Sequence, residues 1–292
     1  MNMGKLKWVG VLLVMTPLTA LAGQSVDKSW ELDTKASISI ENIAGEIVIQ
    51  AWERKEAQLT GELGNSVEEL EINASKSSLQ IRVQNRNERN VDSTELKLMV
   101  PKGASIDAAG VSADITVLGM DNEKITATSV SGDVEVEATS DWISIESVSG
   151  DVGFDGKTKR ISAESVSGDI DLSGISGEIA ATTVSGDMEL QAGSIESAKL
   201  ETVSGDIMVA GEISGNGRLT AESMSGDVTI SLPSSQSALF KAQSFSGRIT
   251  TDFGSVDQAK HGPGSHLKHM SGKGGAEVRV ESFSGNIKLT HD

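Results

Sequence analysis

Residues 161–172 read ISAESVSGDIDL, and the phrase VSGD inside this stretch returns, with small changes, along most of the chain. Copies begin at Val130, Val148, Val166, Val184, Val203 and Met224; a copy with Ala for Gly begins at Val111, and degenerate copies begin at Phe245 and Phe283. Counted from Gly132, successive repeat glycines are 18, 18, 18, 19, 21, 21 and 38 residues apart, the last spacing being close to two periods. A repeat of about 20 residues predicts a solenoid in which each coil stacks on the next.

Apolar and polar residues alternate within each repeat, which is the pattern of a β-strand with one buried side. In the quoted stretch, Ile161 and Ser165 stand at odd-numbered positions, whereas Val166 and Gly168 stand at even-numbered ones, so the two pairs have opposite parity. The parity changes between Ser165 and Val166, and at the same place in the other clear copies, which predicts a bend there. We therefore predict an all-β fold: a single-stranded parallel β-solenoid, or β-helix, with about 18–21 residues per coil and right-handed crossovers.

Each position of the motif receives a structural role. We expect Val130 and Val134, with their equivalents, to point inward as stacked aliphatic columns. Ser131 and Asp133 are expected to face outward or to cap the turn by bonding backbone amides. The repeat glycines are expected at a corner where a side chain would clash or where φ must be positive. These structural repeat glycines are Gly132, Gly150, Gly168, Gly186, Gly205, Gly226, Gly247 and Gly285.

The motif aspartates are also weak candidates for a metal site. Stacked coils would align Asp133, Asp151, Asp169, Asp187, Asp206 and Asp227 in one column. Carboxylates a few ångströms apart repel one another and could recruit Ca²⁺. The calcium-binding β-roll, however, has a nine-residue repeat with a different arrangement of Gly and Asp. Turn chemistry is therefore the favoured interpretation, and no cofactor is predicted.

Residues 252–275 break the repeat and carry three of the four histidines, His261, His266 and His269, among several glycines. Neutral imidazole is a ligand for Zn²⁺, Cu²⁺ or Ni²⁺. These spacings match no common zinc motif, and glycine-rich flanks give little preorganisation. We therefore favour a Gly/His-rich loop that replaces part of one coil over a metal site.

Composition narrows the function. The chain has 292 residues, a formal net charge of −17 and neither cysteine nor tyrosine. The absence of Cys excludes disulfides, Cys-ligated zinc and thiol catalysis, and the acidic balance argues against nucleic acid as a partner. Carboxylates that recur on nearly every coil suit an architectural role better than a catalytic pair, and no nucleophile elbow, HExxH or P-loop is present. We therefore predict that the protein is not an enzyme and has no catalytic residues.

The N-terminus has the pattern of an export signal. Two lysines precede an apolar run over residues 8–18, and a small-x-small triplet ends at Ala22. This order predicts a signal peptide, residues 1–22, that is cleaved after Ala22, and the run is short for a membrane span. Because no second apolar stretch follows, we expect an exported protein without a membrane span, either periplasmic or extracellular at the cell surface.

The segment before the main array alternates but lacks the VSGD phrase. Candidate strands lie at 36–40, 46–50, 57–62, 70–74, 79–84 and 94–100, and Asn42–Ile47 weakly echoes the repeat. Solenoids need atypical ends that cover the open core and the unpaired strand edge. We therefore assign 23–103 to an N-terminal β cap or first coils, and 104–292 to the repeat solenoid, which includes the loop at 252–275.

The serial phrases resemble the bacterial putative-adhesin family of the DUF4097 type. The approach LKLMVPKG at 96–103 and the closing GAEVRVESFSGNI at 275–287 also fit this family. The resemblance covers roughly residues 30–290 and implies a β-solenoid, a cell-envelope or secreted location and an adhesive role, with no defined functional residues. The chain departs from the motif at Ala113, Arg248 and Asn286, which interrupts a continuous column of aspartates.

Two classes of function follow from these observations. The first is a non-catalytic exported protein of the cell envelope or surface, an adhesin or structural interaction scaffold whose partner is an unknown protein or glycan. The alternative is a glycan-binding or glycan-processing β-helix protein of the periplasm. Self-association through the ends of the solenoid is a third expectation, because open solenoid ends expose unpaired strand edges.

Overall fold

The structure is a computed structural model that describes residues 24–87, 91–258 and 264–292. The predicted signal peptide, residues 1–22, and His261 lie outside these ranges. Within them the chain forms one sheet of nineteen strands and no helix, so the predicted all-β fold is confirmed. The strands are β1 (Gln24–Glu31), β2 (Ser37–Trp52), β3 (Glu56–Leu63), β4 (Val67–Ala74), β5 (Ser78–Asn85), β6 (Thr94–Pro101), β7 (Ser105–Thr128), β8 (Val134–Glu146), β9 (Val152–Glu164), β10 (Ile170–Ser185), β11 (Met188–Ser204), β12 (Ile207–Ser225), β13 (Val228–Leu232), β14 (Ala238–Ser244), β15 (Ile249–Thr251), β16 (Asp257–Gln258), β17 (Ser265–Met270), β18 (Ala276–Ser282) and β19 (Ile287–His291).

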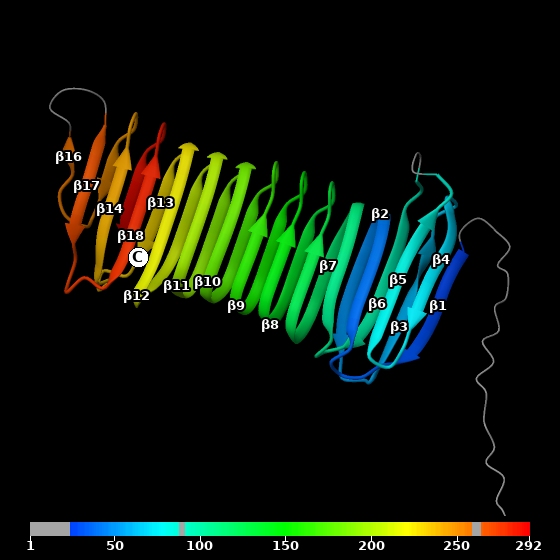
Figure 1. The fold of residues 1–292 in the computed structure, drawn as a ribbon. Helices are drawn as coiled ribbons and strands as arrows, with labels where there is room; N and C mark the ends of the chain where they lie inside the picture. The colour runs from blue at the N-terminus through cyan, green and yellow to red at the C-terminus, as the bar shows by residue number, and fades with distance from the viewer. Residues whose placement is uncertain (1–23, 88–90, 259–263) are drawn as a thin grey trace, which may run out of the picture.

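Parallel coils stack along one axis and form one elongated solenoid, which we call the rack (Figure 1). The register links Ile115 in turn to Val134, Val152, Ile170, Met188, Ile207 and Val228 in successive coils. These steps are 19, 18, 18, 18, 19 and 21 residues long. The predicted parallel β-solenoid and its period are therefore confirmed.

Each central coil has two sides because its strand continues round one corner. β8 runs without interruption through both sides. We call face A the outward side of residues 134–139 and of the residues paired with them, and face B the outward side of 142–146 and its paired residues. The VSGD turn forms the other corner, the turn edge, which lies at the arrow tips of β8 and β9 in Figure 1.

The core is a thin layer between the two faces. Val134 and Val136 on one side and Ile143 and Ile145 on the other are at most 2% exposed, and their equivalents extend one hydrophobic cluster along the rack. Burying such a side chain contributes about 1.5–3 kcal/mol. The inward position predicted for Val134 and its equivalents is therefore confirmed, and the small number of aromatic residues suits a layer this thin.

The first apolar residue of the motif points outward, so its predicted inward position is wrong. Val166 is 44% exposed, whereas Ser165 before it is 5% exposed. Ser165 Oγ accepts a hydrogen bond from Gly168 N (3.0 Å) and donates one to Gly150 O of the neighbouring coil (3.2 Å). Because this hydroxyl takes the inward position, Val166 and Ser167 both face solvent before the chain turns in again at Gly168.

The buried hydroxyl of the turn gives a first prediction. We expect Ser147→Ala to lower the free energy of unfolding by about 1–3 kcal/mol, because a buried amide then loses its partner. Ser147 Oγ accepts from Gly150 N (3.0 Å) and donates to Gly132 O (3.1 Å). Ser147→Thr should cost less, since Thr183 fills the same position in another coil and keeps the bond to the glycine carbonyl. Ser149→Ala, at an exposed position of the same turn, is the control; equal urea midpoints for the two alanine variants would contradict the prediction.

Stacking order departs from sequence order at the C-terminal end. β18 pairs in parallel with β12 on one side and β14 on the other, and β19 lies likewise between β13 and β15. The last repeat of the chain is therefore inserted between two earlier ones, and the expectation that each coil stacks on the next is wrong here. β14 also pairs antiparallel with β17, whose other neighbour is the short strand β16.

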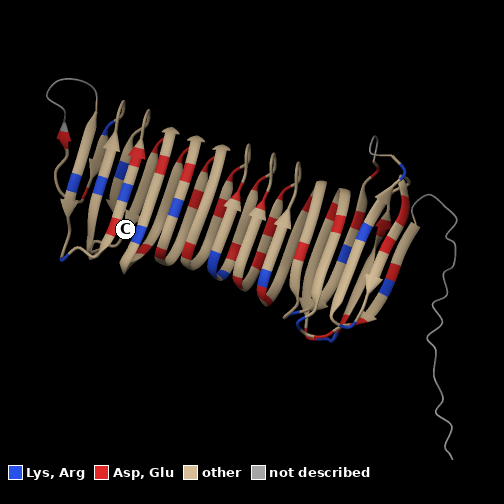
Figure 2. Cartoon of the chain, viewed as in Figure 1, with Lys and Arg blue, Asp and Glu red and all other residues tan. Residues whose placement is uncertain are grey.

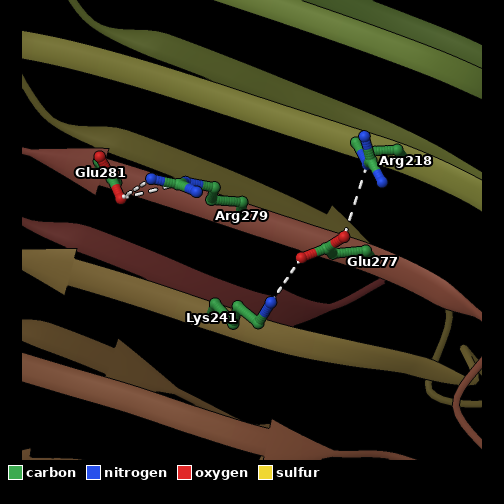
Figure 3. A network of polar contacts seen from close by, with 5 residues as sticks. All are labelled: Arg218, Lys241, Glu277, Arg279 and Glu281. Atoms are coloured by element: carbon green, nitrogen blue, oxygen red, sulfur yellow. Dashed lines mark hydrogen bonds and ion pairs between the residues drawn. The ribbon is translucent and has the colours of Figure 1, made fainter.

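An ion-pair network joins the inserted repeat to both of its neighbours (Figure 3). Glu277 on β18 contacts Lys241 on β14 (2.7 Å) and Arg218 on β12 (3.5 Å). Arg279 and Glu281 pair beside them along β18 (2.7 Å). The hydrogen bond from Lys241 lowers the pKa of Glu277, which keeps this carboxyl ionised. Because exposed pairs contribute only about 0–1 kcal/mol each, most of the stability of the inserted repeat comes from its buried residues.

The N-terminal end is built in a similar way. β2 pairs in parallel with β7 on one side and with β5 and β6 on the other. Gly45 is level with Ala113, which confirms that Asn42–Ile47 echoes the repeat. β4 pairs antiparallel with β5, and β3 pairs antiparallel with β6 and β1. Antiparallel strands thus end both faces of the stack at the N-terminal end, but only face B at the C-terminal end; on face A the described stack ends at β15, which pairs in parallel with β19. An antiparallel end interrupts the regular pairing pattern that another copy of the repeat would continue.

Candidate functional site

A column of glycine at the turn edge lets neighbouring coils approach closely. A Cβ added to Gly168 would lie closer than 3.0 Å to Gly150 O, and each of the other seven repeat glycines faces a carbonyl oxygen of the neighbouring coil in the same way. None of these eight glycines has a positive φ. The close approach, rather than an unusual backbone conformation, is therefore the reason for glycine at these positions.

The motif aspartates form hydrogen bonds between successive coils. Asp151 Oδ1 accepts a hydrogen bond from Asp169 N (2.9 Å), and Asp169 Oδ1 accepts one from Asp187 N (2.8 Å). We call the whole series the Asp ladder: it comprises Asp114, Asp133, Asp151, Asp169, Asp187, Asp206 and Asp227, continues through Asn286 and ends at the amide of Arg248. Each carboxylate thus binds a backbone amide, which is the turn chemistry favoured from the sequence.

The two described histidines of the predicted loop do not converge. The segment contains β16 and β17, which the alternation did not predict, and His266 and His269 both lie on β17. Since they are three residues apart on a strand, their side chains project from opposite sides of it. Across the described ranges, no group of three His, Asp or Glu residues is placed to hold a metal ion.

The outward apolar residues of the turns form a continuous line along the turn edge. We call them the apolar ridge, which in spatial order consists of Val111, Val130, Val148, Val166, Val184, Val203, Met224, Phe283 and Phe245. Their exposed fractions lie between 43% and 60%. The rings of Phe283 and Phe245 stack with centroids 4.9 Å apart, although 38 residues separate them in the sequence. Exposed apolar patches of this regularity are typical of interaction sites.

Carboxylates lie on both sides of the apolar ridge. The Asp ladder follows it on the side of face A. On the side of face B, a row of paired residues precedes it, comprising Glu146, Glu164, Thr182, Glu201, Glu222 and Glu281. Figure 2 shows that acidic residues occur on most coils of the rack. The turn edge therefore combines an apolar centre with acidic borders.

Face A also carries an acidic hollow of about 460 Å³. It opens where Gly153 interrupts a row of longer side chains, and no Lys or Arg lines it. Its carboxylates belong to Glu135, Glu137, Asp155, Asp171 and Glu189. Partial burial raises the pKa of Asp171, and the nearby charge of Glu189 adds to this effect. The hollow is shallow and open to solvent.

The pKa of Asp171 predicts a stability effect. Folding raises this pKa above its ordinary value of 3.8. At a pH just above 3.8, Asp171 is therefore protonated more often in the folded chain than in the unfolded chain. The charged carboxylate therefore destabilises the fold at neutral pH, and stability is regained as the pH falls through the folded-state pKa. We expect Asp171→Asn to melt at a slightly higher temperature than the parent at neutral pH, with the difference shrinking to zero on acidification. Thermal melts of both proteins across this range measure it, and a difference that grows toward acid pH would contradict it.

Sequence reasoning missed both the apolar ridge and the buried hydroxyl behind it. The signal was present, because a Ser or Thr stands three residues before each repeat glycine from Gly132 onward. A hydroxyl at that distance can accept the glycine amide, as in a turn closed by Ser or Thr. Assigning the inward position to Ser165 would have placed Val166 outside.

The regular elements of the described residues are strands only, so none of them is a helix that is long and apolar enough to cross a bilayer.

The family described as Toastrack DUF4097 matches residues 35–290 of the chain. A search of curated proteins finds no match. Among solved structures, a "putative lipid binding protein" from Parabacteroides distasonis is 10% identical with a TM-score of 0.53, covering 92% of this chain and 98% of that one. A "putative adhesin" from Bacteroides fragilis is 13% identical with a TM-score of 0.48, covering 91% and 97% of the two chains.

A further "putative adhesin", from Parabacteroides merdae, is 12% identical with a TM-score of 0.44, covering 91% of this chain and 96% of that one. At such identities a similarity concerns the fold alone. The Parabacteroides distasonis protein, whose TM-score exceeds 0.5, therefore supports the rack architecture and says nothing of what this chain binds.

Proposed function

The chain belongs to the Toastrack DUF4097 family, whose match covers residues 35–290, and from this premise we propose that it is a non-catalytic, exported interaction scaffold of the cell envelope, of the adhesin type. One observation carries the proposal: the outward residues of the turn edge repeat in register from coil to coil. A repeated surface presents many equivalent contacts at fixed spacing, which suits multivalent binding to a partner.

The chemistry of the surface supports a binding role over catalysis. Catalytic sites place a few different groups around one reacting atom. Here each carboxylate of the Asp ladder accepts a hydrogen bond from a backbone amide of the neighbouring coil. Most of the buried hydroxyls of the turns donate a hydrogen bond to a glycine carbonyl. These groups are consequently part of the architecture. Export is supported by the signal-peptide pattern of residues 1–22.

Protease treatment of intact cells tests the location and with it the adhesive role. An antibody against residues 24–292 would follow the chain after fractionation and after shaving of whole cells. Cleavage on intact cells, or recovery from the medium, is the expected result. Protection until the outer layer is opened would place the chain in the periplasm and would exclude adhesion. Turnover of an envelope glycan by the purified chain would overturn the non-catalytic assignment.

A further inference from the structure

We propose that the apolar ridge is a docking site for a cationic amphipathic α-helix of a partner protein. The inference rests on the proposed interaction function and adds to it a surface and the chemistry of its partner. It is built from the outward residues of the turns, whose exposure the sequence pattern did not predict.

The length of the ridge suits a macromolecular segment rather than a small molecule. Nine side chains at a coil spacing of about 4.8 Å extend roughly 38 Å. An α-helix of about 25 residues spans this distance. The ridge follows the turn edge, which is a convex corner of the solenoid. It is continuous, because the turn of the inserted repeat places Phe283 between Met224 and Phe245. A small ligand would need a concave site, which a convex edge does not offer.

The charges that border the ridge define the partner as cationic. The carboxylates of the Asp ladder face solvent on one side, and Glu146, Glu164 and Glu222 on the other side make no ion pair among the described residues. Lys or Arg side chains that reach over an apolar contact could pair with both rows. The same charges oppose docking on an anionic lipid surface. They also oppose a second copy of the chain, since ridge-to-ridge packing would bring like-charged rows together.

The geometry favours a helix over an extended partner. A strand alternates its side chains, so an apolar side against the ridge would place the cations on the opposite side, away from the carboxylates. A helix can carry an apolar stripe with Lys or Arg along both borders of that stripe. Only the helix therefore brings apolar and cationic groups to the turn edge at the same time.

Binding of a designed peptide to the purified chain tests the proposal. The probe is a fluorescein-labelled peptide of about 25 residues, with Leu at helical spacing and Lys on both borders. Control peptides carry Glu in place of Lys, or Ser in place of Leu. Fluorescence anisotropy gives the affinity, and circular dichroism reports helix formation on binding. We expect only the Leu/Lys peptide to bind and become helical, with an affinity that falls as salt is added.

Ridge variants assign the binding to this surface. The triple variant Val148→Thr, Val166→Thr and Val184→Thr keeps β-branched side chains and should weaken peptide binding by about tenfold or more. Met208→Thr removes an apolar side chain that is 48% exposed on face A, and should change binding by less than about twofold. Unchanged melting temperatures would show that both variants fold.

Several results would overturn the proposal. Equal binding by the parent and the triple variant would do so, as would equal binding of the Ser/Lys peptide, which would mean attraction by charge alone. Self-association of the parent that the triple variant abolishes would assign the ridge to a second copy. These outcomes are independent of cell location and of glycan turnover, so the ridge can fail while the proposed function stands.

Discussion

Replacing Gly168 with alanine is expected to unfold the central coils, with a loss of about 3 kcal/mol or more in the free energy of unfolding. The added Cβ would overlap Gly150 O of the neighbouring coil. That carbonyl cannot move away freely, because Ser165 Oγ donates a hydrogen bond to it (3.2 Å). The coils on both sides are held by further ladder bonds, so relief of the overlap would have to separate strands that are paired along their length.

Gly153→Ala is the matched control for this substitution. Gly153 also lies in a central coil, but its nearest neighbour to an added Cβ is the side chain of Glu135 at 3.6 Å, an ordinary contact. The control should therefore unfold at the parent's urea concentration or slightly above it. If Gly168→Ala does not accumulate as folded protein while Gly153→Ala does, the prediction holds. Equal midpoints for both variants would show that the coils can separate enough to admit a methyl group.

One natural departure from glycine supports this reading of the column. Ala113 occupies the glycine position of the first VSGD-like turn and is fully buried there. Its partner in the adjacent coil is Gly45, which has a φ of 115°. The backbone below Ala113 therefore differs from the backbone below the repeat glycines, whose φ values are not positive. Glycine is required where one regular turn stacks on another.

The spacing of the repeat glycines was enough to predict the period of the coils. The alternation of residues predicted the strands and the inward position of Val134, because burial on one side of a strand sets a two-residue pattern. It was not enough at the bend. Both Ser165 and Val166 could occupy the inward position there, and hydrophobicity favours the valine. The hydrogen bonds of Ser165 reverse this preference, since the buried amide of Gly168 needs an acceptor inside the turn.

The order in which the last coils stack could not be predicted from the sequence, for a different reason. The strands that pair in the last coils have nearly the same pattern, so Val278 and Val280 on β18 can pack equally well beside several neighbours. The 38-residue spacing before Gly285 fits two consecutive coils as well as it fits an excursion and return. The ion pairs of Glu277 with Lys241 and Arg218 become apparent only once the three strands are placed side by side.

Removal of residues 276–292 is expected to destabilise the whole C-terminal third of the rack. This deletion takes away β18 and β19, and with them four large apolar side chains that are at most 1% exposed: Val278, Val280, Ile287 and Leu289. Each such burial contributes about 1.5–3 kcal/mol. It also leaves β14 without its parallel partner and exposes one edge of β12. We expect a fall in melting temperature and rapid proteolysis between β13 and β17, because the terminal coils would have no packed neighbour.

Two comparisons separate the inserted repeat from a mere loss of chain length. Removing only Asp292, the exposed residue that follows β19, should leave the melting temperature nearly unchanged. A peptide of residues 276–292 added to the truncated chain should restore protection, since β18 can pair again between β12 and β14, and β19 between β13 and β15. Hydrogen exchange of β12 and β14 would follow this recovery. An unchanged melting temperature after the longer deletion would mean that the coils on either side close directly on each other, and that the inserted repeat adds little to the stability of this end.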